Sequence, residues 1–211
     1  MKKTSKCKTC RRLGTKLFLK GDRCFTAKCP MIRRPYPPGM KSKFNKGLSQ
    51  YGREFKEKQK LKKWYGLREV QFKNYVKDVL EKRSSGKSKD SPTLLIQKLE
   101  SRLDNVIFKM GLANSRALSR QLISHGHFLV NGKKVNVPSY HLKIGDKITI
   151  SSKSLKGNVF KNALSSLEKK TLPGWIFFDV KKTEGVIKSF PSLEEVAPPV
   201  EISLIFEFYS R

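Results

Sequence analysis

Apolar residues spaced three and four positions apart predict helices in the first half of the chain. Residues 51–65 are dense in charge, and residues 68–83 carry an apolar stripe typical of a helix that packs on a core. That stripe consists of Phe72, Tyr75, Val76, Val79 and Leu80. A polar break over residues 84–92 follows, and it predicts a domain boundary near residue 90.

A second helical pattern begins at Leu94 and ends at Gly111, because glycine suits the left-handed conformation that terminates helices. Its apolar stripe consists of Leu99, Leu103, Val106, Ile107 and Met110. Ser115 is placed to cap a further helix, which ends at Gly126. The pattern therefore predicts two successive helices over residues 94–126.

Strand patterns begin after Gly126. Residues 128–130 and 133–135 flank Asn131 and Gly132, and an Asn-Gly pair accepts the positive φ angles of a tight hairpin turn. Residues 142–150 add a further strand. These patterns predict a small antiparallel sheet next to the two helices.

Apolar runs at residues 175–178 and 202–206 are typical of sheet core, so we expect strands in the C-terminal segment. The fold class is then α+β. We expect a mainly helical N-terminal domain over residues 1–90, a module of two helices on an antiparallel sheet over 91–155, and a C-terminal β extension over 156–211. The pattern leaves open whether the extension completes the module or packs on the first domain.

The charge of the chain indicates a polyanionic partner. Its 211 residues carry a formal net charge of +29. Residues 1–50 hold 15 basic residues against one acidic residue, whereas residues 151–211 hold 9 against 7. A membrane surface is the competing polyanion, but no apolar run approaches the length of about 18 residues that would indicate a membrane helix. We therefore expect nucleic acid as the partner, with no membrane and no small-molecule substrate.

Four cysteines lie within the first thirty residues. Cys7, Cys10, Cys24 and Cys29 are separated by two, thirteen and four residues, which allows two short chelating loops to surround one tetrahedral zinc ion. Four thiolates leave no coordination position open, so the site would be structural. No apolar signal segment follows the first residues, so we expect reduced thiols and favour metal over disulfide. Two incidental cysteine pairs are the alternative. The many surrounding basic residues are expected to lower the pKa values of the cysteines.

Two further segments suggest RNA contacts. The prolines of residues 33–39 favour an extended strap that presents Arg33, Arg34 and Tyr36, although the segment also suits a plain linker. Lys56, Lys60 and Lys63 recur at spacings of four and three, which predicts that they share one helical face. Six of the fifteen residues in 51–65 are basic and two are acidic, an imbalance that favours RNA binding over mere solvation.

Longer motifs resemble a known family. The run from Leu99 to Asp104, the segments around Arg116 and Arg120, and Asn131-Gly132 closely resemble the RNA-binding module named after small-subunit ribosomal protein four. The flanking segments resemble that ribosomal protein too, over nearly the whole chain. They are Tyr51-Gly52, Glu57-Lys58-Gln59-Lys60, Trp64-Tyr65-Gly66, Gln71-Phe72 and Glu207-Phe208-Tyr209-Ser210. With Arg11, Arg12 and residues 33–39, the four cysteines resemble the zinc-bearing version of the family's N-terminus, and we expect Arg11 and Arg12 to contact RNA.

The resemblance implies a cytoplasmic structural component of the small ribosomal subunit. It implies direct binding to small-subunit rRNA, nucleation of the subunit body, contact with small-subunit protein five, and a part in translational accuracy together with proteins five and twelve. In the second module, we expect one face to contact phosphates and 2′-hydroxyl groups. It would consist of Arg116, Arg120, Gln121, Lys133 and Lys134. A merely solvated helix face is the alternative, and we expect that reversing the charges of Arg116 and Arg120 leaves the fold intact.

Parts of the sequence are compatible with two other functions. Arg102-Leu103-Asp104 resembles a motif of some pseudouridine synthases, which would make the chain an RNA-modifying enzyme. No second catalytic domain is left to hold a substrate base, and His125, His127 and His141 have no paired nucleophile in the sequence, so we expect no enzyme. A regulatory RNA binder that represses its own messenger is the third hypothesis, and mRNA is then a further partner.

Overall fold

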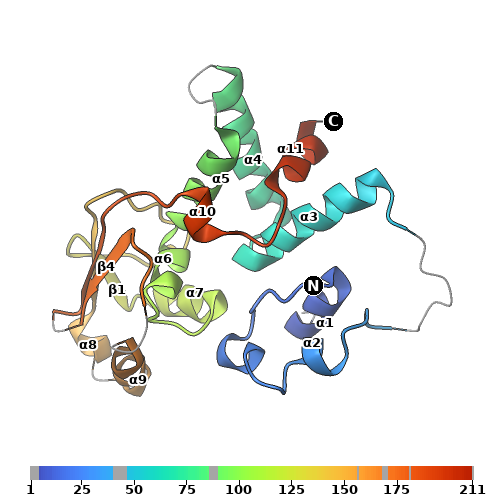
Figure 1. The fold of residues 1–211 in the computed structure, drawn as a ribbon. Coiled ribbons are helices and arrows are strands. Elements are labelled where there is room, and N and C mark those ends of the chain that lie inside the picture. The colour runs from blue at the N-terminus through green and yellow to red at the C-terminus, as the bar shows by residue number, and fades with distance from the viewer. Residues whose placement is uncertain are drawn as a thin grey trace. The chain divides into compact units, whose positions relative to one another are not determined.

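A computed structural model describes residues 5–39, 47–85, 90–155, 157–167, 171–180 and 182–210. The chain divides into two compact units (Figure 1). The first combines Met1–Leu95 with Ala197–Arg211, and the second is Ile96–Val196. The segment predicted as a C-terminal extension, residues 156–211, is therefore shared between the two units. The centre of the predicted polar break, residues 86–89, lies outside the described residues.

Helices make up the first unit within the described residues. They are α1 (Lys6–Leu13), the short 3-10 helix η1 (Gly21–Cys24), α2 (Pro30–Arg33), α3 (Gln50–Tyr65), α4 (Glu69–Ser84), the start of α5 (Ser91–Glu100) and α11 (Ile202–Ser210). The Ser49 hydroxyl caps α3 by accepting a hydrogen bond from the Gly52 amide at 3.2 Å. Gly66 ends α3 in the left-handed conformation, at a φ of 67°. Both helices predicted over residues 51–83 are confirmed.

Helix α11 packs along α3 and α4 (Figure 1). Its buried residues are Ile202, Ile205 and Phe206. The strand predicted at residues 202–206 is wrong, because these apolar residues recur at spacings of three and four and so line one face of a helix. In the opposing helix α4, Phe72, Val76 and Val79 are fully buried, as its stripe predicts.

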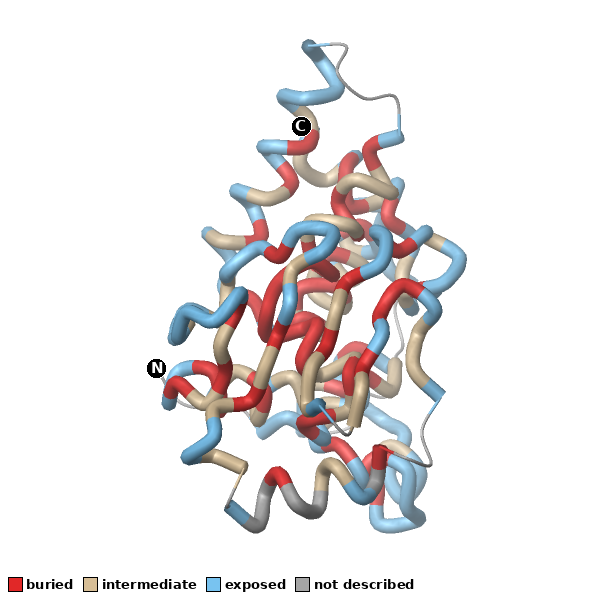
Figure 2. Tube along the Cα trace, turned by 90° about the vertical axis from the view of Figure 1, so that its left-hand side faces the viewer, coloured by how far each residue is buried: buried red, intermediate tan, exposed pale blue. Residues whose placement is uncertain are grey.

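The second unit packs helices on a five-stranded antiparallel sheet. The strands are β1 (Phe128–Val130), β2 (Lys133–Lys134), β3 (Lys147–Ile150), β4 (Ile176–Asp179) and β5 (Glu184–Ile187), in the order β2-β1-β3-β5-β4. Its helices are α6 (Leu103–Lys109), α7 (Arg116–Ser124), α8 (Ser152–Leu155), α9 (Asn158–Leu167) and α10 (Leu193–Val196). Buried residues alternate with more exposed ones along the strands, so one face of the sheet is turned to the core (Figure 2).

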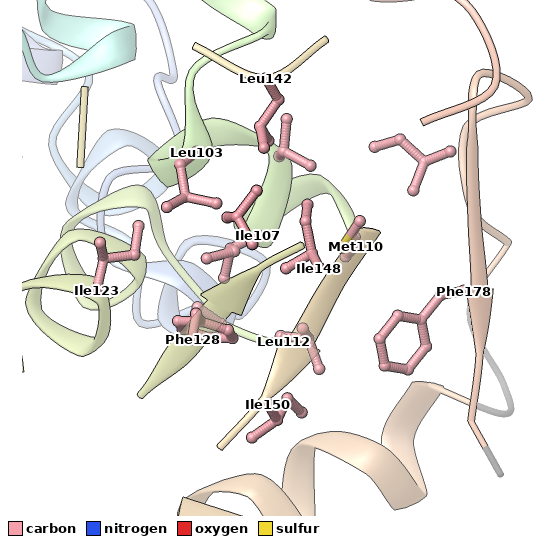
Figure 3. Packing of buried hydrophobic residues seen from close by; sticks show 14 of the residues in the cluster. Leu103, Ile107, Met110, Leu112, Ile123, Phe128, Leu142, Ile148, Ile150 and Phe178 are labelled. Atoms are coloured by element: carbon pink, nitrogen blue, oxygen red, sulfur yellow. The ribbon is translucent and has the colours of Figure 1, made fainter. Parts of the chain in front are cut away.

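The core of this unit joins α6 and α7 to the sheet. Leu103 and Ile107 of α6 and the following Met110 meet Phe128 and Ile148 from the strands (Figure 3). At Gly185 of β5 a Cβ atom would lie 2.5 Å from the Met110 Cε atom, so any other residue there would require the Met110 side chain to shift. Asn131 and Gly132 have φ angles of 49° and 77°, which confirms the predicted hairpin turn.

The predicted helix from Leu94 to Gly111 is broken in two. Helix α5 ends at Glu100 and α6 begins at Leu103, because the intervening backbone turns aside to pair with the segment before β3. Arg102 forms a β-bridge with His141, and the Leu142 amide donates to the Ser101 carbonyl at 2.9 Å. The apolar stripe is nevertheless buried as predicted. No helix in the described ranges is both long enough and apolar enough to cross a membrane.

Candidate nucleic-acid interface

A groove between α1 and α3 gathers basic side chains of the first unit. It is a cavity of about 570 Å³, which we call the α1–α3 groove. Lys8 and Arg12 of α1 and Lys56 and Lys63 of α3 line it. The other lining residues are Thr9, Leu13, Leu48, Gly52, Phe55 and Gln59, so no described Asp or Glu contributes to its wall. The groove therefore offers four cations to an anion without local competition from a carboxylate.

Apolar contacts hold α1 in place beside α3. Leu13 and Leu17 are buried together with Cys10, and Trp64 of α3 packs against this cluster. Gly14 ends α1 in the left-handed conformation at a φ of 70°, which turns the chain away after two helical turns. The short helix thus presents Lys8 and Arg12, four residues apart, on the groove side.

The other predicted basic residues of the first unit lie outside this groove. Lys60 forms an ion pair with Glu57 at 2.5 Å and lines a neighbouring cavity. The Arg11 Nε atom donates to the Tyr36 carbonyl at 2.9 Å, and its guanidinium lies 5.0 Å from the centre of the Tyr36 ring. Arg33 was predicted to begin the extended segment but is the last residue of α2, so the non-helical segment begins at Arg34; both are exposed. Tyr36 and Arg11 therefore form one small exposed cluster.

The four cysteines come together at one small cavity. Cys7 and Cys10 lie on α1, Cys24 ends η1, and Cys29 precedes α2. All four are free thiols, and all four line a cavity of about 20 Å³. This volume is close to that of one water-sized sphere, so it is the size that a single ion requires. The backbone amide of Lys20 also donates to the Cys24 sulfur at 3.4 Å.

The electrostatics of the thiols differ from the sequence prediction. Burial raises the pKa of Cys10, and the neighbouring thiols raise it further, so the predicted lowering by lysines is wrong for this residue. Within the described ranges, no three or more Cys, His, Asp or Glu side chains lie in an arrangement that could hold a metal ion. The arrangement brings the four donors to one place without forming a complete ligand set.

A second polar cluster connects α3, α4 and α11. The Glu69 carboxylate pairs with Lys58 at 2.8 Å and with Lys62, and it accepts a hydrogen bond from the Tyr209 hydroxyl at 3.0 Å. Burial alone would raise the pKa of Glu69, but these three donors lower it to about 2. Burial and the Glu69 carboxylate raise the pKa of Tyr209. The Glu69 carboxylate therefore stays ionised at neutral pH, and its contacts link α11 to α3 and α4.

In the second unit, a buried carboxylate organises the start of α6. The Asp104 side chain is 3% exposed and pairs with Arg102 at 2.8 Å and with Arg120 at 2.5 Å. The Arg102 side chain is equally buried, whereas that of Arg120 is 32% exposed. The Ser119 hydroxyl donates to the Asp104 carbonyl. Asp104 therefore joins α6 to α7, as an ion-pair residue and not as a surface residue.

A parallel set of contacts involves the neighbouring Asn105. Its side-chain amide donates to the Glu100 carboxylate at 2.5 Å, and its side-chain carbonyl accepts from the Arg116 Nε atom at 2.7 Å. The Arg116 guanidinium also lies 4.6 Å from the centre of the Phe108 ring. Arg116 and Arg120 thus both have partners inside the protein. RNA contact by either arginine stays a prediction. Reversing both charges would break these internal contacts, so it should destabilise the fold and not leave it intact.

The remaining residues of the predicted second face are open to solvent. Gln121 on α7 is exposed, and so are Lys133 and Lys134 of β2. Since β2 is an edge strand of the sheet, its lysines project where a large polyanion can reach them. These three side chains remain the accessible part of that face.

The three histidines make local structural contacts. The His141 Nδ1 atom lies 3.1 Å from the Ser101 hydroxyl, at the break between α5 and α6. The His127 Nδ1 atom lies 2.8 Å from the Ser154 hydroxyl. Burial lowers the pKa of His127, and the positive neighbours His125 and Lys134 lower it further. The expectation that these histidines have no paired nucleophile is therefore wrong for His127 and His141, each of which contacts a serine hydroxyl.

Sequence reasoning missed several residues of the α1–α3 groove. Gly52, Phe55 and Gln59 recur along α3 at helical spacing, so the periodicity could have placed them on one face with the predicted Lys56 and Lys63. Lys8 gave no comparable signal, because α1 is only eight residues long and its partner helix is distant in sequence.

Comparisons with known proteins cover both units. Residues 1–100 match the model of the ribosomal protein S4/S9 N-terminal domain, and residues 101–148 match the S4 domain. The small ribosomal subunit protein uS4 of Kosmotoga olearia is 46% identical over 205 residues, which is 97% of this chain and 96% of that protein. The protein of the same name from Thermotoga maritima is 46% identical over 206 residues, with the same coverage. Protein uS4A of Myxococcus xanthus is 44% identical over 207 residues, 98% of this chain and 97% of its own length.

Proposed function

The chain belongs to the ribosomal protein uS4 family, and on that premise we propose that it is a structural, rRNA-binding constituent of the small ribosomal subunit. The observation that carries this proposal is identity of 46% over 97% of the chain, spanning both matched domains. The role is structural and not catalytic. The basic α1–α3 groove and the exposed edge lysines supply the chemistry that this role needs.

The proposed mechanism is a two-point grip on RNA. The groove of the first unit and the exposed Lys133 and Lys134 of the second unit would each neutralise backbone phosphates, and the exposed Gln121 would hydrogen-bond to the same RNA. Fixing two RNA segments to one protein offsets their mutual repulsion, which is how binding would nucleate the body of the subunit early in assembly. Contact with small-subunit proteins five and twelve, and through it a contribution to translational accuracy, belongs to the same proposal.

The proposal includes one structural zinc ion on Cys7, Cys10, Cys24 and Cys29. Four free thiols at a single-ion cavity are a donor set that zinc prefers, and they support this assignment. A bound ion would fix α1 relative to α2 and supply no chemistry to a reaction. Metal analysis of the purified protein should find one zinc per chain, and chelation should loosen the N-terminal region. A metal-free protein with unchanged stability in chelator would remove zinc from the proposal.

The test of the main proposal is competition binding. Purified protein should bind the 5′ domain of small-subunit rRNA in the presence of excess unrelated structured RNA, at low and at higher salt. Electrostatic contacts weaken as salt rises for every RNA, so retained preference at higher salt indicates specific binding. If the unrelated RNA competes equally at both salt concentrations, direct specific binding to rRNA is wrong.

A further inference from the structure

The composition of the α1–α3 groove favours an anion with an apolar part. Its four cations stand around an apolar wall that includes Leu13 and Phe55. The neighbouring cavity of about 490 Å³ contains Arg53, Lys56 and Lys60 but also Glu57 and Glu201, so its charges largely offset one another. The two cavities share Lys56, and of these two the α1–α3 groove is the one that combines cations with apolar surface and has no carboxylate among its described lining residues.

The size of the groove limits what can enter it. A cavity of about 570 Å³ lies in the range of about 300–1,000 Å³ that accommodates small ligands. An RNA double helix is a broad convex surface with stacked bases, so it can touch the rim but cannot fill such a cavity. A nucleotide that leaves the stack has both a free aromatic face and a phosphate, and unstacked bases are the usual targets of specific RNA recognition.

Phe55 provides a pre-arranged surface for a base. Its side chain is 41% exposed although it lines the groove. The ring is held by Phe208 of α11 at a centroid distance of 6.0 Å and by the Lys58 ammonium at 4.7 Å. Tyr51, one turn earlier, stacks on it at 6.3 Å but does not line the groove. An aromatic ring fixed by its neighbours loses little conformational entropy when a base stacks on it.

We infer that the α1–α3 groove holds one unpaired nucleotide of the bound RNA, with its base against Phe55 and its phosphates on Lys8, Arg12, Lys56 and Lys63. This inference rests on the proposed rRNA-binding function and adds to it the recognition of an unstacked residue. The first unit then distinguishes an RNA junction or loop from a regular double helix, and charge alone cannot make that distinction.

The test compares single-stranded and double-stranded probes on the full-length protein. Decauridylate serves as the single strand and a self-complementary RNA duplex of similar length as the double strand. Phe55→Leu keeps the apolar bulk but removes the ring, and it should weaken decauridylate binding about tenfold, since a stacked base is worth about 1–3 kcal/mol. Duplex binding should stay within twofold. Phe55→Tyr should retain the single-strand affinity.

Phe177→Leu in the second unit is the matched control, because Phe177 is 48% exposed and lies outside the groove. Circular dichroism checks the helix content of each variant. Crosslinking of wild-type protein to decauridylate that carries one 4-thiouridine should label peptides of α1 or α3, which tests the site without any substitution. Equal loss with Phe177→Leu, or unchanged decauridylate affinity with Phe55→Leu, overturns the nucleotide site. Specific binding to the 5′ domain of rRNA would still stand in that case, so failure here is distinguishable from failure of the proposed function.

Discussion

Arginine serves opposite purposes in the two units. In the second unit, Arg102 and Arg120 converge on the buried Asp104 carboxylate. In the first unit, Arg12 faces the α1–α3 groove, where no described carboxylate contributes to the wall. Both environments lie in one strongly basic chain, so net charge alone does not identify the RNA-binding residues. The difference shows that the nearest carboxylate decides whether a guanidinium supports the fold or remains available to a phosphate.

The largest effect is expected from removing the carboxylate itself. Asp104→Ala leaves the buried Arg102 guanidinium without its ion pair, which should destabilise the second unit by about 3–5 kcal/mol. Urea unfolding followed by circular dichroism measures the loss. Asp146→Ala is the control, since the Asp146 carboxylate makes exposed hydrogen bonds to Asn131 and Lys143. Equal, small effects of both substitutions would contradict the structural role of Asp104.

The same substitution at two arginines should give opposite outcomes. Arg120→Ala removes the half-exposed partner of Asp104, while Arg102 remains, so it should cost about 1–2 kcal/mol of unfolding free energy. Arg12→Ala should leave stability within about 0.5 kcal/mol, because Arg12 is exposed, and should weaken rRNA binding instead. Thermal unfolding and filter binding of both variants check the contrast. The comparison between the units breaks down if Arg12→Ala is the more destabilising change.

A single lysine of the groove should be visible in the salt dependence of binding. Lys63→Gln removes one expected phosphate contact. The negative slope of log affinity against log salt should therefore become shallower by about 0.7–0.9. Lys73→Gln on α4 is the matched control, because Lys73 is exposed and lies outside the groove. Titrations at several salt concentrations give both slopes. Identical slopes would indicate that the groove contributes no more than any surface charge.

The smallest effect concerns the acid stability of the first unit. The pKa of Glu69 is lowered from 4.5 to about 2, so its stabilising contribution is complete above the ordinary value and is lost as pH falls towards 2. Because the side chain is 43% exposed, we expect solvent screening to limit the contribution to about 1 kcal/mol. Stability measured from about pH 6 down to about pH 2 should fall less steeply in Glu69→Gln than in the wild type. Parallel curves would show that the cluster around Glu69 adds nothing to stability.

Local patterns were sufficient to predict much of the fold. The stripe of α4 and the Asn131-Gly132 turn are encoded by neighbouring residues, so their periodicity and turn chemistry identified them. The break before α6 depends on pairing between Arg102 and His141, which are far apart in sequence. Helix α11 was mistaken for a strand because a short apolar run suits either element, and its partner α3 decides between them.

The candidate site was less predictable for the same reason. Helical spacing predicts that Lys56 and Lys63 share a face. The groove also contains Lys8 of α1, and no local sequence pattern predicts that α1 contacts α3. For Arg116 and Arg120, local spacing predicted too much exposure. Their spacing indicated a shared exposed face, whereas Asn105 and Asp104 engage them from another helix. The sequence therefore predicts which residues share a helical face, but it does not predict which side chains of other elements contact that face.

Because α11 packs on α3, the order in which the chain is synthesised affects when the first unit can fold. A growing chain emerges from its N-terminus, yet residues 197–210 complete the unit that contains α1, α3 and α4. The second unit, contiguous over Ile96–Val196, can close before residues 197–210 are synthesised, while the first waits for them. A message cut short before the codons for residues 197–210 would thus produce a chain with a finished second unit and an unfinished first one. Synthesis of residues 197–210 becomes a condition for building the unit that holds the α1–α3 groove.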